Sequence, residues 1–330
     1  MESVTKLRIL YLYQYLLQHT DAAHPMSTVE LSNMLEKEYG ITTARNTISN
    51  DLTMLANSGL NIRVIRRTQN VYYYDGAAFE LPELKILIDA VSATKFIAER
   101  KSEELINKLM SMTSLDNAQK LRRNIEVEGR VKTDNQCGYD IVDIINEGID
   151  TRRKIAFCYT DFDVDKKRYL TNDGRKYTVS PYTLIWDGDY YYLRGYCDER
   201  EAMRTFRLDR IDRTPEILME AAVPKPDDYD VAQYRKSVFR MYDTDQPVEV
   251  ELFCHVSTMK VLIDNFGLDV DTRPVDADHF IARVKVCTSP TFYRWVFGFG
   301  CNIEILQPQG IRDEFERMLR IACDQYASKE

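Results

Sequence analysis

Long apolar runs are absent from this sequence of 330 residues. No stretch approaches the roughly 18 uninterrupted apolar residues that a membrane helix needs. The first ten residues, MESVTKLRIL, also have no cleavable signal pattern. These absences argue against a membrane protein and a secreted protein, so we expect a cytoplasmic protein with no membrane partner.

Cysteine pairs with metal-binding or redox spacing are missing as well. The seven cysteines are odd in number and widely scattered, without a C-x-x-C pair. Zinc ribbons and thioredoxin-like redox sites use such pairs. We therefore expect reduced and mostly buried thiols, and no metal site.

The motifs of common enzyme classes are missing too. The sequence has no G-x-S-x-G, no P-loop and no H-E-x-x-H motif. Gly298 and Gly300 do not meet the G-x-G-x-x-G requirement of a dinucleotide site, and the four histidines are dispersed. His255 and His279 could meet in space, but packed or exposed histidines are more common than ligands in strand-like runs. We expect a protein that is not an enzyme and has no cofactor.

Charge is unevenly distributed along the chain. The formal net charge is −8, and residues 216–330 carry 13 basic and 20 acidic side chains. Residues 41–70 are instead locally +3, because four arginines and Asp51 are their only charged residues. An acidic total argues only weakly against nucleic-acid binding when a basic segment is present.

Residues 1–78 are predicted to form helix, helix, turn, helix and β-hairpin. The second helix begins at Ser27, where S-T-V-E forms a capping box. The third helix places Ile48, Leu52 and Leu55 on one stripe, and the runs IRVIRR and VYYY flank a polar turn. This is the order of a winged helix-turn-helix, whose third helix enters the major groove while the wing contacts phosphates.

Candidate DNA contacts lie on the third helix and the hairpin. Asparagine can pair bidentately with adenine and arginine with guanine, and arginines also suit phosphates. The predicted DNA-binding residues are Arg45, Asn46, Thr47, Ser49, Asn50, Thr53, Arg63, Arg66 and Arg67. The alternative is a small helical domain with a solvated polar face.

The segment TTARNTISNDLTMLANSGLNI resembles the recognition helix of bacterial winged-helix regulators that carry a C-terminal WYL domain. Members of that family commonly read S-x-R-T-I-x-R-D-L there. The T-I and D-L pairs match, whereas Asn46 and Asn50 stand where arginines are expected. This departure lowers the local positive charge, so the strength and salt dependence of DNA binding stay open.

Residues 79–148 are predicted to form a helical connector. L-P-E-L places Pro82 in a first helical turn, and Leu84, Leu87 and Ile88 begin a run of apolar residues at helical spacing. A segment that packs against a partner chain or the next domain and a simple spacer both fit this pattern.

Residues 149–220 contain four short runs of β-branched and aromatic residues, which predict a small antiparallel barrel or sheet. The blocks S-P-Y, Y-Y-L followed by G-Y, and F-R-L-D-R-I resemble the signature of the WYL domain, with Tyr191 in place of the eponymous tryptophan. The resemblance implies an Sm-like or SH3-like β-barrel. It also implies a ligand-sensing site, which in some members accepts single-stranded nucleic acid.

Aromatic rings that stack on bases and cations that follow phosphates would suit such a ligand. The predicted effector-binding residues are Tyr182, Tyr192, Arg194, Arg204, Arg207 and Arg210. One alternative is that the tyrosines fill the barrel and that Arg207 and Arg210 pair with carboxylates. Another is a small anionic metabolite as the ligand.

The last part of the chain follows a predicted linker at residues 221–246. Residues 247–330 alternate strands and helices in a βαβαβα-like order and resemble the C-terminal extension of WYL regulators, which often contributes to a homodimer. The predicted fold class is therefore α+β multidomain, with a winged helix-turn-helix, a helical connector, a small WYL β-barrel and an α/β extension.

Together these features predict a transcriptional regulator. It would bind a double-stranded operator as a homodimer, with half-sites in an inverted repeat, and sense an anionic effector through the barrel. The alternative is an RNA- or single-stranded-DNA-binding accessory protein of a defence or repair complex, which Asn46 and Asn50 keep open.

Overall fold

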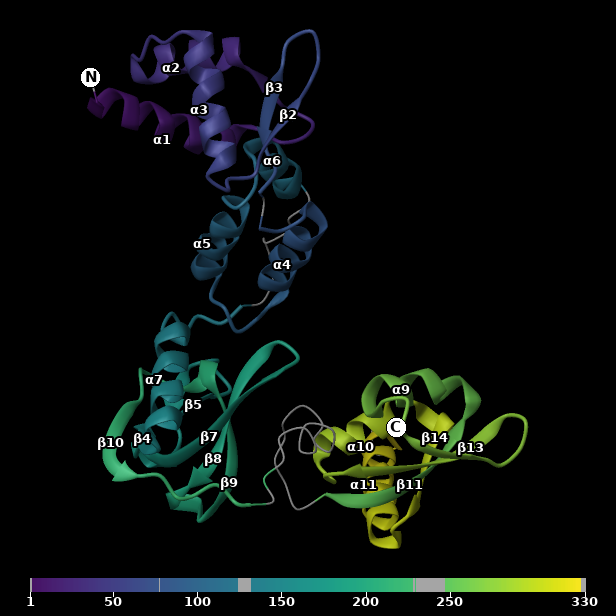
Figure 1. Ribbon diagram of the computed structural model, residues 1–330. Coiled ribbons are helices and arrows are strands. Elements are labelled where there is room, and N and C mark those ends of the chain that lie inside the picture. The colour runs from purple at the N-terminus through teal and green to yellow at the C-terminus, as the bar shows by residue number, and fades with distance from the viewer. Residues whose placement is uncertain (1, 77, 124–131, 228, 230–246, 328–330) are drawn as a thin grey trace. The chain divides into compact units, whose positions relative to one another are not determined.

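The computed structural model describes residues 2–76, 78–123, 132–227, 229 and 247–327. The chain forms two compact units, residues 1–136 and residues 137–330 (Figure 1). Both contain helices and antiparallel sheets, which confirms the predicted α+β class. Among the described residues, no helix combines the length and the apolar character needed to cross a bilayer.

The first unit begins with three helices and a small sheet. Helices α1 (Glu2–His19), α2 (Thr28–Tyr39) and α3 (Arg45–Asn57) precede a hairpin of β2 and β3 (Figure 1). The three strands lie in the order β1-β3-β2, and they are β1 (Met26–Ser27), β2 (Ile62–Ile65) and β3 (Val71–Tyr74). The predicted capping box is present at Ser27, and α2 ends at Gly40 with a φ of 65°.

The apolar stripes of these helices meet in one core. Its buried residues are Leu12, Leu16, Leu31, Met34, Leu35, Ile48, Leu52 and Tyr72. Ile48, Leu52 and Leu55 are buried, as their spacing on the third helix predicts. The opposite face of α3 is consequently directed to solvent.

Among its described residues, the first unit has three more helices, namely α4 (Leu81–Ala93), α5 (Glu99–Met110) and α6 (Leu115–Arg122). They share a second core of Leu84, Ile88, Ile106, Met110 and Leu121. The Lys132 ammonium donates to the carbonyl oxygen of Thr94 and to the Ser102 hydroxyl, each at 2.8 Å. These bonds join the end of α4 to α5.

The second unit begins with α7 (Gly138–Thr151) and an antiparallel sheet in the order β10-β4-β7-β8-β9. Its strands are β4 (Arg153–Phe157), β7 (Tyr177–Asp187), β8 (Tyr190–Cys197), β9 (Ala202–Arg207) and β10 (Glu216–Ala221). A separate hairpin pairs β5 (Thr160–Phe162) with β6 (Arg168–Leu170). Buried Ile141 and Ile145 of α7 belong to the face that lies against β4 and β7 (Figure 1).

Gly195 allows a close approach within this sheet. The β7–β8 register shifts between Pro181 and Thr183. A Cβ atom at position 195 would lie 2.3 Å from the Ser180 carbonyl oxygen. The irregular pairing therefore requires a residue without a side chain at position 195.

The C-terminal part is a four-stranded antiparallel sheet in the order β12-β13-β11-β14 with three helices. Its elements are β11 (Val248–His255), α9 (Met259–Phe266), β12 (Asp271–Pro274), β13 (His279–Val286), α10 (Pro290–Phe297), β14 (Ile303–Gln307) and α11 (Gln309–Ala327). The predicted βαβαβα-like order omits β12, so the observed order is βαββαβα. Most of the predicted linker lies outside the described residues.

Candidate nucleic-acid and effector interfaces

The orientation of α3 is fixed by an ion pair on its inner side. Arg8 of α1 donates from Nε to Asp51 Oδ2 at 2.6 Å and from Nη2 to Oδ1 at 3.1 Å. Only 11% of the Arg8 side chain and 8% of the Asp51 side chain are exposed. Two parallel bonds hold a guanidinium in one orientation, so this pair reinforces the orientation of α3 that its buried apolar stripe sets.

The predicted contacts on α3 divide into two groups. Arg45, Asn46, Asn50 and Thr53 are exposed, as expected. Thr47 and Ser49 are half-buried, and Ser49 Oγ lies 3.4 Å from the Tyr72 hydroxyl of β3. The exposed group lies where an incoming ligand could reach it without rearrangement.

Three further residues of α3 are exposed, Met54, Ala56 and Asn57. Sequence reasoning did not include them among the candidates. Met54 and Asn57 follow Asn50 by four and seven residues, which places them near it on a helix, so the helical period was a sufficient signal for these two.

The hairpin carries the three predicted arginines, all of them exposed. Arg63 lies on β2, and its Nε donates to Asp75 Oδ2 at 3.2 Å. Arg66 and Arg67 lie in the turn between β2 and β3. The turn therefore places two positive charges at the tip of the hairpin, where a wing would meet phosphates.

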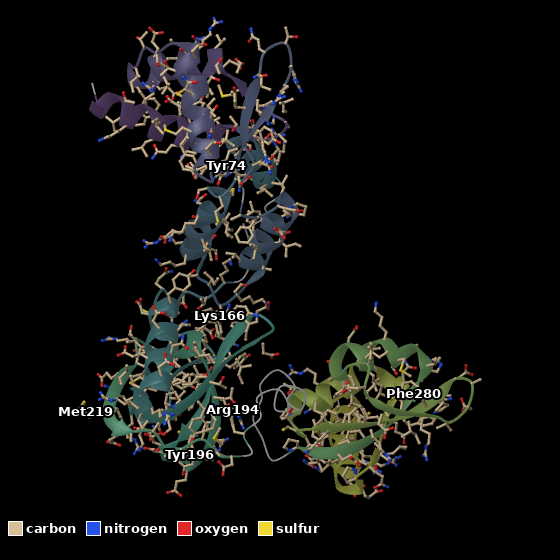
Figure 2. All side chains as sticks on the ribbon, viewed as in Figure 1. Tyr74, Lys166, Arg194, Tyr196, Met219 and Phe280 are labelled. Carbon is tan, nitrogen blue, oxygen red and sulfur yellow. The ribbon has the colours of Figure 1, made fainter. Side chains whose placement is uncertain are left out.

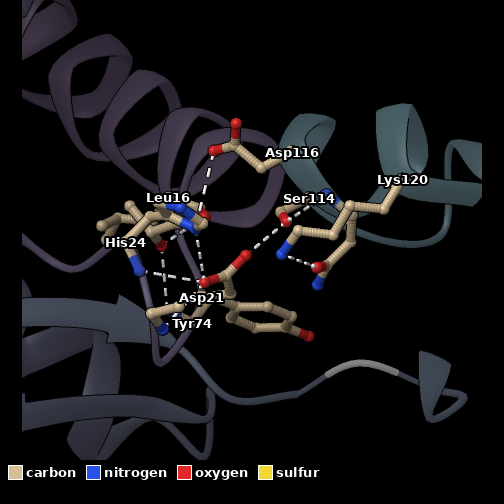
Figure 3. A network of polar contacts seen from close by, with 10 residues as sticks. Leu16, Asp21, His24, Tyr74, Ser114, Asp116 and Lys120 are labelled. Atoms are coloured by element: carbon tan, nitrogen blue, oxygen red, sulfur yellow. Dashed lines mark hydrogen bonds and ion pairs between the residues drawn. The ribbon is translucent and has the colours of Figure 1, made fainter.

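A polar network joins the loop after α1 to α6 (Figure 3). The Ser114 hydroxyl donates to Asp21 Oδ2 at 2.6 Å and also accepts the backbone N–H of Asn117, which caps α6. His24 Nδ1 lies 2.9 Å from Asp21 Oδ1 and 3.6 Å from Asp116 Oδ2. The network connects the α1–α3 part of the first unit with its α4–α6 part.

These bonds also set the ionisation of Asp21. Partial burial alone would raise the pKa of this carboxyl group. The bonds from Ser114, from His24 and from the backbone of Ala23 and His24 outweigh that effect and lower the pKa below its usual value. The network therefore stabilises the ionised carboxylate.

In the second unit, the pairing of β8 with β9 decides which side chains share a face. Tyr192 lies opposite Arg207, and Arg194 lies opposite Thr205. Alternation along the strands places these four residues on one side of the sheet. Arg204, opposite Gly195, belongs to the other side and is exposed. The predicted effector residues are thus divided between two faces.

Arg207 is held by two neighbours. Its guanidinium carbon lies 3.6 Å from the centre of the Tyr190 ring. Nη2 and Nε donate to the two carboxylate oxygens of Asp209, at 2.7 and 3.1 Å. Burial alone would lower the pKa of Arg207, but the bond to Asp209 raises it above its usual value. Arg207 is therefore a fixed cation whose charge Asp209 partly compensates.

The two predicted tyrosines are buried. Tyr182 donates from its hydroxyl to the Pro224 carbonyl oxygen at 3.1 Å, and its ring meets the edge of Tyr229. Tyr192 packs with Ile185 and Tyr190. Burial raises the pKa of both phenols. The half-buried Tyr190 offers more accessible ring surface than either predicted tyrosine.

Arg194 and Arg210 also have polar neighbours. Arg194 (labelled in Figure 2) donates from Nη1 to Thr205 Oγ1 at 3.1 Å. Arg210, in the short 3₁₀ helix η3 (Leu208–Arg210), lies 3.9 Å from Asp161 Oδ1. Arg194 and Arg210 therefore each have a polar partner within residues 149–220.

The histidine pair considered from the sequence does meet. His255 and His279 are paired across β11 and β13, with ring centres 5.5 Å apart. His279 Nδ1 lies 3.0 Å from Asp276 Oδ1, and His255 Nδ1 lies 2.8 Å from Ser257 Oγ. Within the described residues, no group of three or more histidine, cysteine, aspartate or glutamate side chains could hold a metal ion.

Comparison with known proteins identifies two domains and one curated relative. The WYL domain matches residues 140–215, and the WCX domain matches residues 246–322. A protein described as "Uncharacterized HTH-type transcriptional regulator YobV", from Bacillus subtilis (strain 168), is 26% identical over 182 residues. The match covers 53% of this chain and 52% of the relative, so the chain spans about half the length of the curated relative it matches.

Two solved structures are also similar. Proteasome accessory factor B/C (PafBC) of Arthrobacter aurescens is 18% identical, with a TM-score of 0.29, and the match covers 97% of this chain and 48% of that chain. The structure described as "Crystal structure of a CRISPR Cas-related protein" is 14% identical, with a TM-score of 0.39, covering 99% and 84%. The chain therefore carries a WYL domain followed by a WCX domain, and over about half of its length it is similar to a protein described as an HTH-type transcriptional regulator.

Proposed function

We propose that this protein is a DNA-binding transcriptional regulator. Residues 1–78 act as a winged helix-turn-helix, and the sheet of residues 149–220 acts as a small Sm-like barrel that senses an anionic effector. The observation that carries the proposal is the exposed polar face of α3 beside a hairpin with two arginines at its tip. The WYL domain and the similarity to an HTH-type transcriptional regulator support the same proposal.

The DNA-binding part of the proposal rests on complementary surfaces. α3 is 13 residues long and presents its exposed polar side to solvent, which suits the major groove. The arginines at the hairpin tip would contact phosphates next to that groove. A protein that binds an operator works beside the chromosome, so the cytoplasmic location expected from the sequence is part of the proposal.

The effector-binding part of the proposal rests on side chains of β8 and of the edge strand β9. Tyr190 and Arg207 are already stacked, and Arg204 adds an exposed cation on the other face of the edge strand. Fixed cations beside an aromatic ring suit a phosphate-containing or other anionic ligand, and single-stranded nucleic acid is one such ligand. Regulation requires that the ligand bind one arrangement of the protein more tightly than another.

Dimerisation is the third element of the proposal. α11 exposes Met318, Ile321 and Tyr326 in its second half. Apolar side chains exposed in this way are suited to pack against a second copy. A symmetric dimer would read an operator with inverted half-sites about one helical turn apart.

Fluorescence anisotropy of the full chain with duplex and single-stranded oligonucleotides, at two salt concentrations, tests the DNA-binding proposal. The double variant Arg66→Ala/Arg67→Ala should weaken duplex binding and lower the slope of log affinity against log salt by about 2. Arg123→Ala, an exposed arginine of the α6 C-cap, is the matched control. Binding to single strands without any duplex binding would favour the accessory-protein alternative and refute the operator proposal.

The effector proposal has its own variant. Arg204→Ala removes an exposed cation and should weaken binding of an anionic single strand by about tenfold, while leaving duplex affinity unchanged. Arg200→Ala is the control, since Arg200 is exposed on the adjacent turn η2 (Asp198–Arg200). An equal loss in both variants would show that Arg204 is not part of the effector site.

A further inference from the structure

The outward face of α3 is a stripe of uncharged hydrogen-bonding side chains. At 3.6 residues per turn the stripe covers an arc of about 60°, opposite the buried side of the helix. Its members are Asn46, Asn50, Thr53 and Asn57, all of them exposed. The 13 residues of α3 contain two charged side chains, Arg45 at the start and Asp51, which is buried against Arg8. Specificity in this helix must therefore come chiefly from amides and apolar groups.

Two features give the stripe an apolar component. The Thr53 hydroxyl donates to the Ser49 carbonyl oxygen at 2.8 Å, so its methyl group is the part left for an outside contact. Met54, at the edge of the stripe, is 50% exposed although it is apolar. An apolar side chain on the outward face of a helix has no role in the core behind it.

We propose that α3 reads A·T base pairs, with Asn46 and Asn50 on adenine edges and Thr53 and Met54 against thymine methyl groups. The inference rests on the proposed DNA-binding function and specifies its operator. In the major groove, an asparagine amide fits adenine N6 and N7, and apolar groups fit the thymine methyl. Arginine or lysine reads guanine, and a carboxylate reads cytosine. Arg45 is the only exposed residue of α3 that carries one of these side chains.

The spacing of the amides indicates how many base pairs they reach. Asn46 and Asn50 are one helical turn apart, about 6 Å along the axis. Base pairs are spaced about 3.4 Å apart, so the two amides reach different base pairs. Each half-site should therefore contain at least two A·T pairs that the amides read separately.

Selection of tight-binding duplexes from a random-sequence library, with the full chain, is the first experiment. The selected half-sites should share at least two A·T pairs. Anisotropy titrations with the selected duplex should then show a loss of about 10- to 100-fold when one of these pairs is changed to G·C. Selected sites whose common core consists of G·C pairs would overturn the inference.

Chemical substitution in the DNA tests the amide contact itself. Replacing one read adenine by 7-deazaadenine removes the N7 acceptor and keeps the base pair. This change should weaken binding of the wild type by about tenfold, and should have no effect on the variant that lacks the matching amide, Asn46→Ala or Asn50→Ala. The variant Asn50→Arg should move the preference at its position from adenine to guanine. Asn33→Ala, an exposed amide on α2, is the control and should keep the full preference.

The outcomes separate this inference from the proposed function. Duplex binding that persists with unchanged base preference in the Asn46→Ala/Asn50→Ala double variant would refute A·T reading and leave the regulator proposal intact. A wild-type chain that binds no duplex in the library, even at low salt, would refute the regulator proposal and the A·T reading with it. Thermal unfolding of each variant at the wild-type midpoint would show that the substitution acts on recognition rather than on folding.

Discussion

The polar side chains of the α3 face and of the β8–β9 face, which we propose as ligand contacts, are in two different states. On α3 the outward amides are exposed, and the strong Arg8–Asp51 bond lies behind them. On β8–β9 the cations are themselves part of the bonded structure, as Arg207 is between Tyr190 and Asp209. The exposed side chains of α3 can contact a ligand without breaking a bond that stabilises the fold. On β8–β9 the Arg207 guanidinium is already held in one orientation, but Asp209 compensates part of its positive charge.

This difference has a consequence for substitutions. Side chains that contact only solvent can be removed with little change in stability, whereas removing one member of a buried ion pair leaves the other without its partner. Substitutions in the α3 stripe should therefore affect binding alone. Substitutions at Asp51, Gly195 or Asp209 should affect folding as well.

The largest effect is expected for Asp51→Ala. It leaves the buried Arg8 guanidinium without its bidentate partner, and should destabilise the first unit by about 3 kcal/mol and abolish duplex binding. Urea denaturation followed by hydrogen exchange of peptides from α1 and α3 would resolve this unit from the rest of the chain. The control is Asp75→Ala, which breaks the exposed pair with Arg63 and should cost less than about 1 kcal/mol. Equal losses of stability in Asp51→Ala and Asp75→Ala would show that burial does not make the Arg8–Asp51 pair more stabilising than the Arg63–Asp75 pair.

The next effect is expected for Gly195→Ala on the β8–β9 face. The added methyl group would lie 2.3 Å from a backbone oxygen, so β7 and β8 must separate, at a cost of about 2 to 3 kcal/mol. Gly310→Ala is the control, because no atom lies within 4 Å of a Cβ there and α11 should gain slightly in stability. Hydrogen exchange in β7 and β8 would report the loss. A stable Gly195→Ala protein would contradict the tight pairing at this position.

Asp209→Ala should have an intermediate effect on stability and a distinctive effect on binding. Arg207 keeps its stack on Tyr190 and some contact with water, so the expected cost is about 2 kcal/mol, smaller than for Asp51→Ala. The same change removes the compensating carboxylate and should tighten binding of an anionic single strand several-fold. The control is Asp212→Ala, at an exposed pair with Arg213. Unchanged or weaker binding in Asp209→Ala would remove Arg207 from the proposed ligand site.

How much of these sites could be predicted depended on whether the decisive contacts were local. The helical period of Ile48, Leu52 and Leu55 was enough to place the buried side of α3, and therefore its exposed residues. The half-burial of Ser49 depends on Tyr72, which comes 23 residues later. No local pattern carries that information.

The sheet shows the same limit more strongly. From sequence alone, alternation grouped Tyr192 with Arg194 and placed Arg204 and Arg207 on opposite faces, but it did not reveal that Tyr192 is buried or that Arg207 lies opposite Tyr192. Those facts depend on cross-strand register and on the irregularity near Gly195. The strand β12 was missed because D-T-R-P has neither alternation nor β-branched apolar residues, and its edge position tolerates a proline.

The smallest of the expected effects concerns the network that joins the α1–α3 part of the first unit to α6. Ser114→Ala removes the bond to Asp21 and the α6 cap, and should cost about 1 kcal/mol at pH 7. Ser111→Ala is the control, since the exposed Ser111 hydroxyl donates to the Lys108 carbonyl oxygen in the last turn of its own helix, α5.

The pH dependence of that cost distinguishes the lost carboxylate bond from the lost cap. Asp21 has a pKa below its usual value in the folded protein, so its contribution is fully present above about pH 4, the ordinary range of an aspartate, and is lost as the pH falls through the lowered pKa. The difference between wild type and Ser114→Ala should therefore be larger at pH 7 than at pH 3, and should lose that pH dependence in an Asp21→Asn background. A difference independent of pH would mean that Ser114 acts through the cap of α6 alone. In that case the Ser114–Asp21 bond would contribute nothing to holding α6 to the α1–α3 part, and packing together with the contacts of His24 would join them.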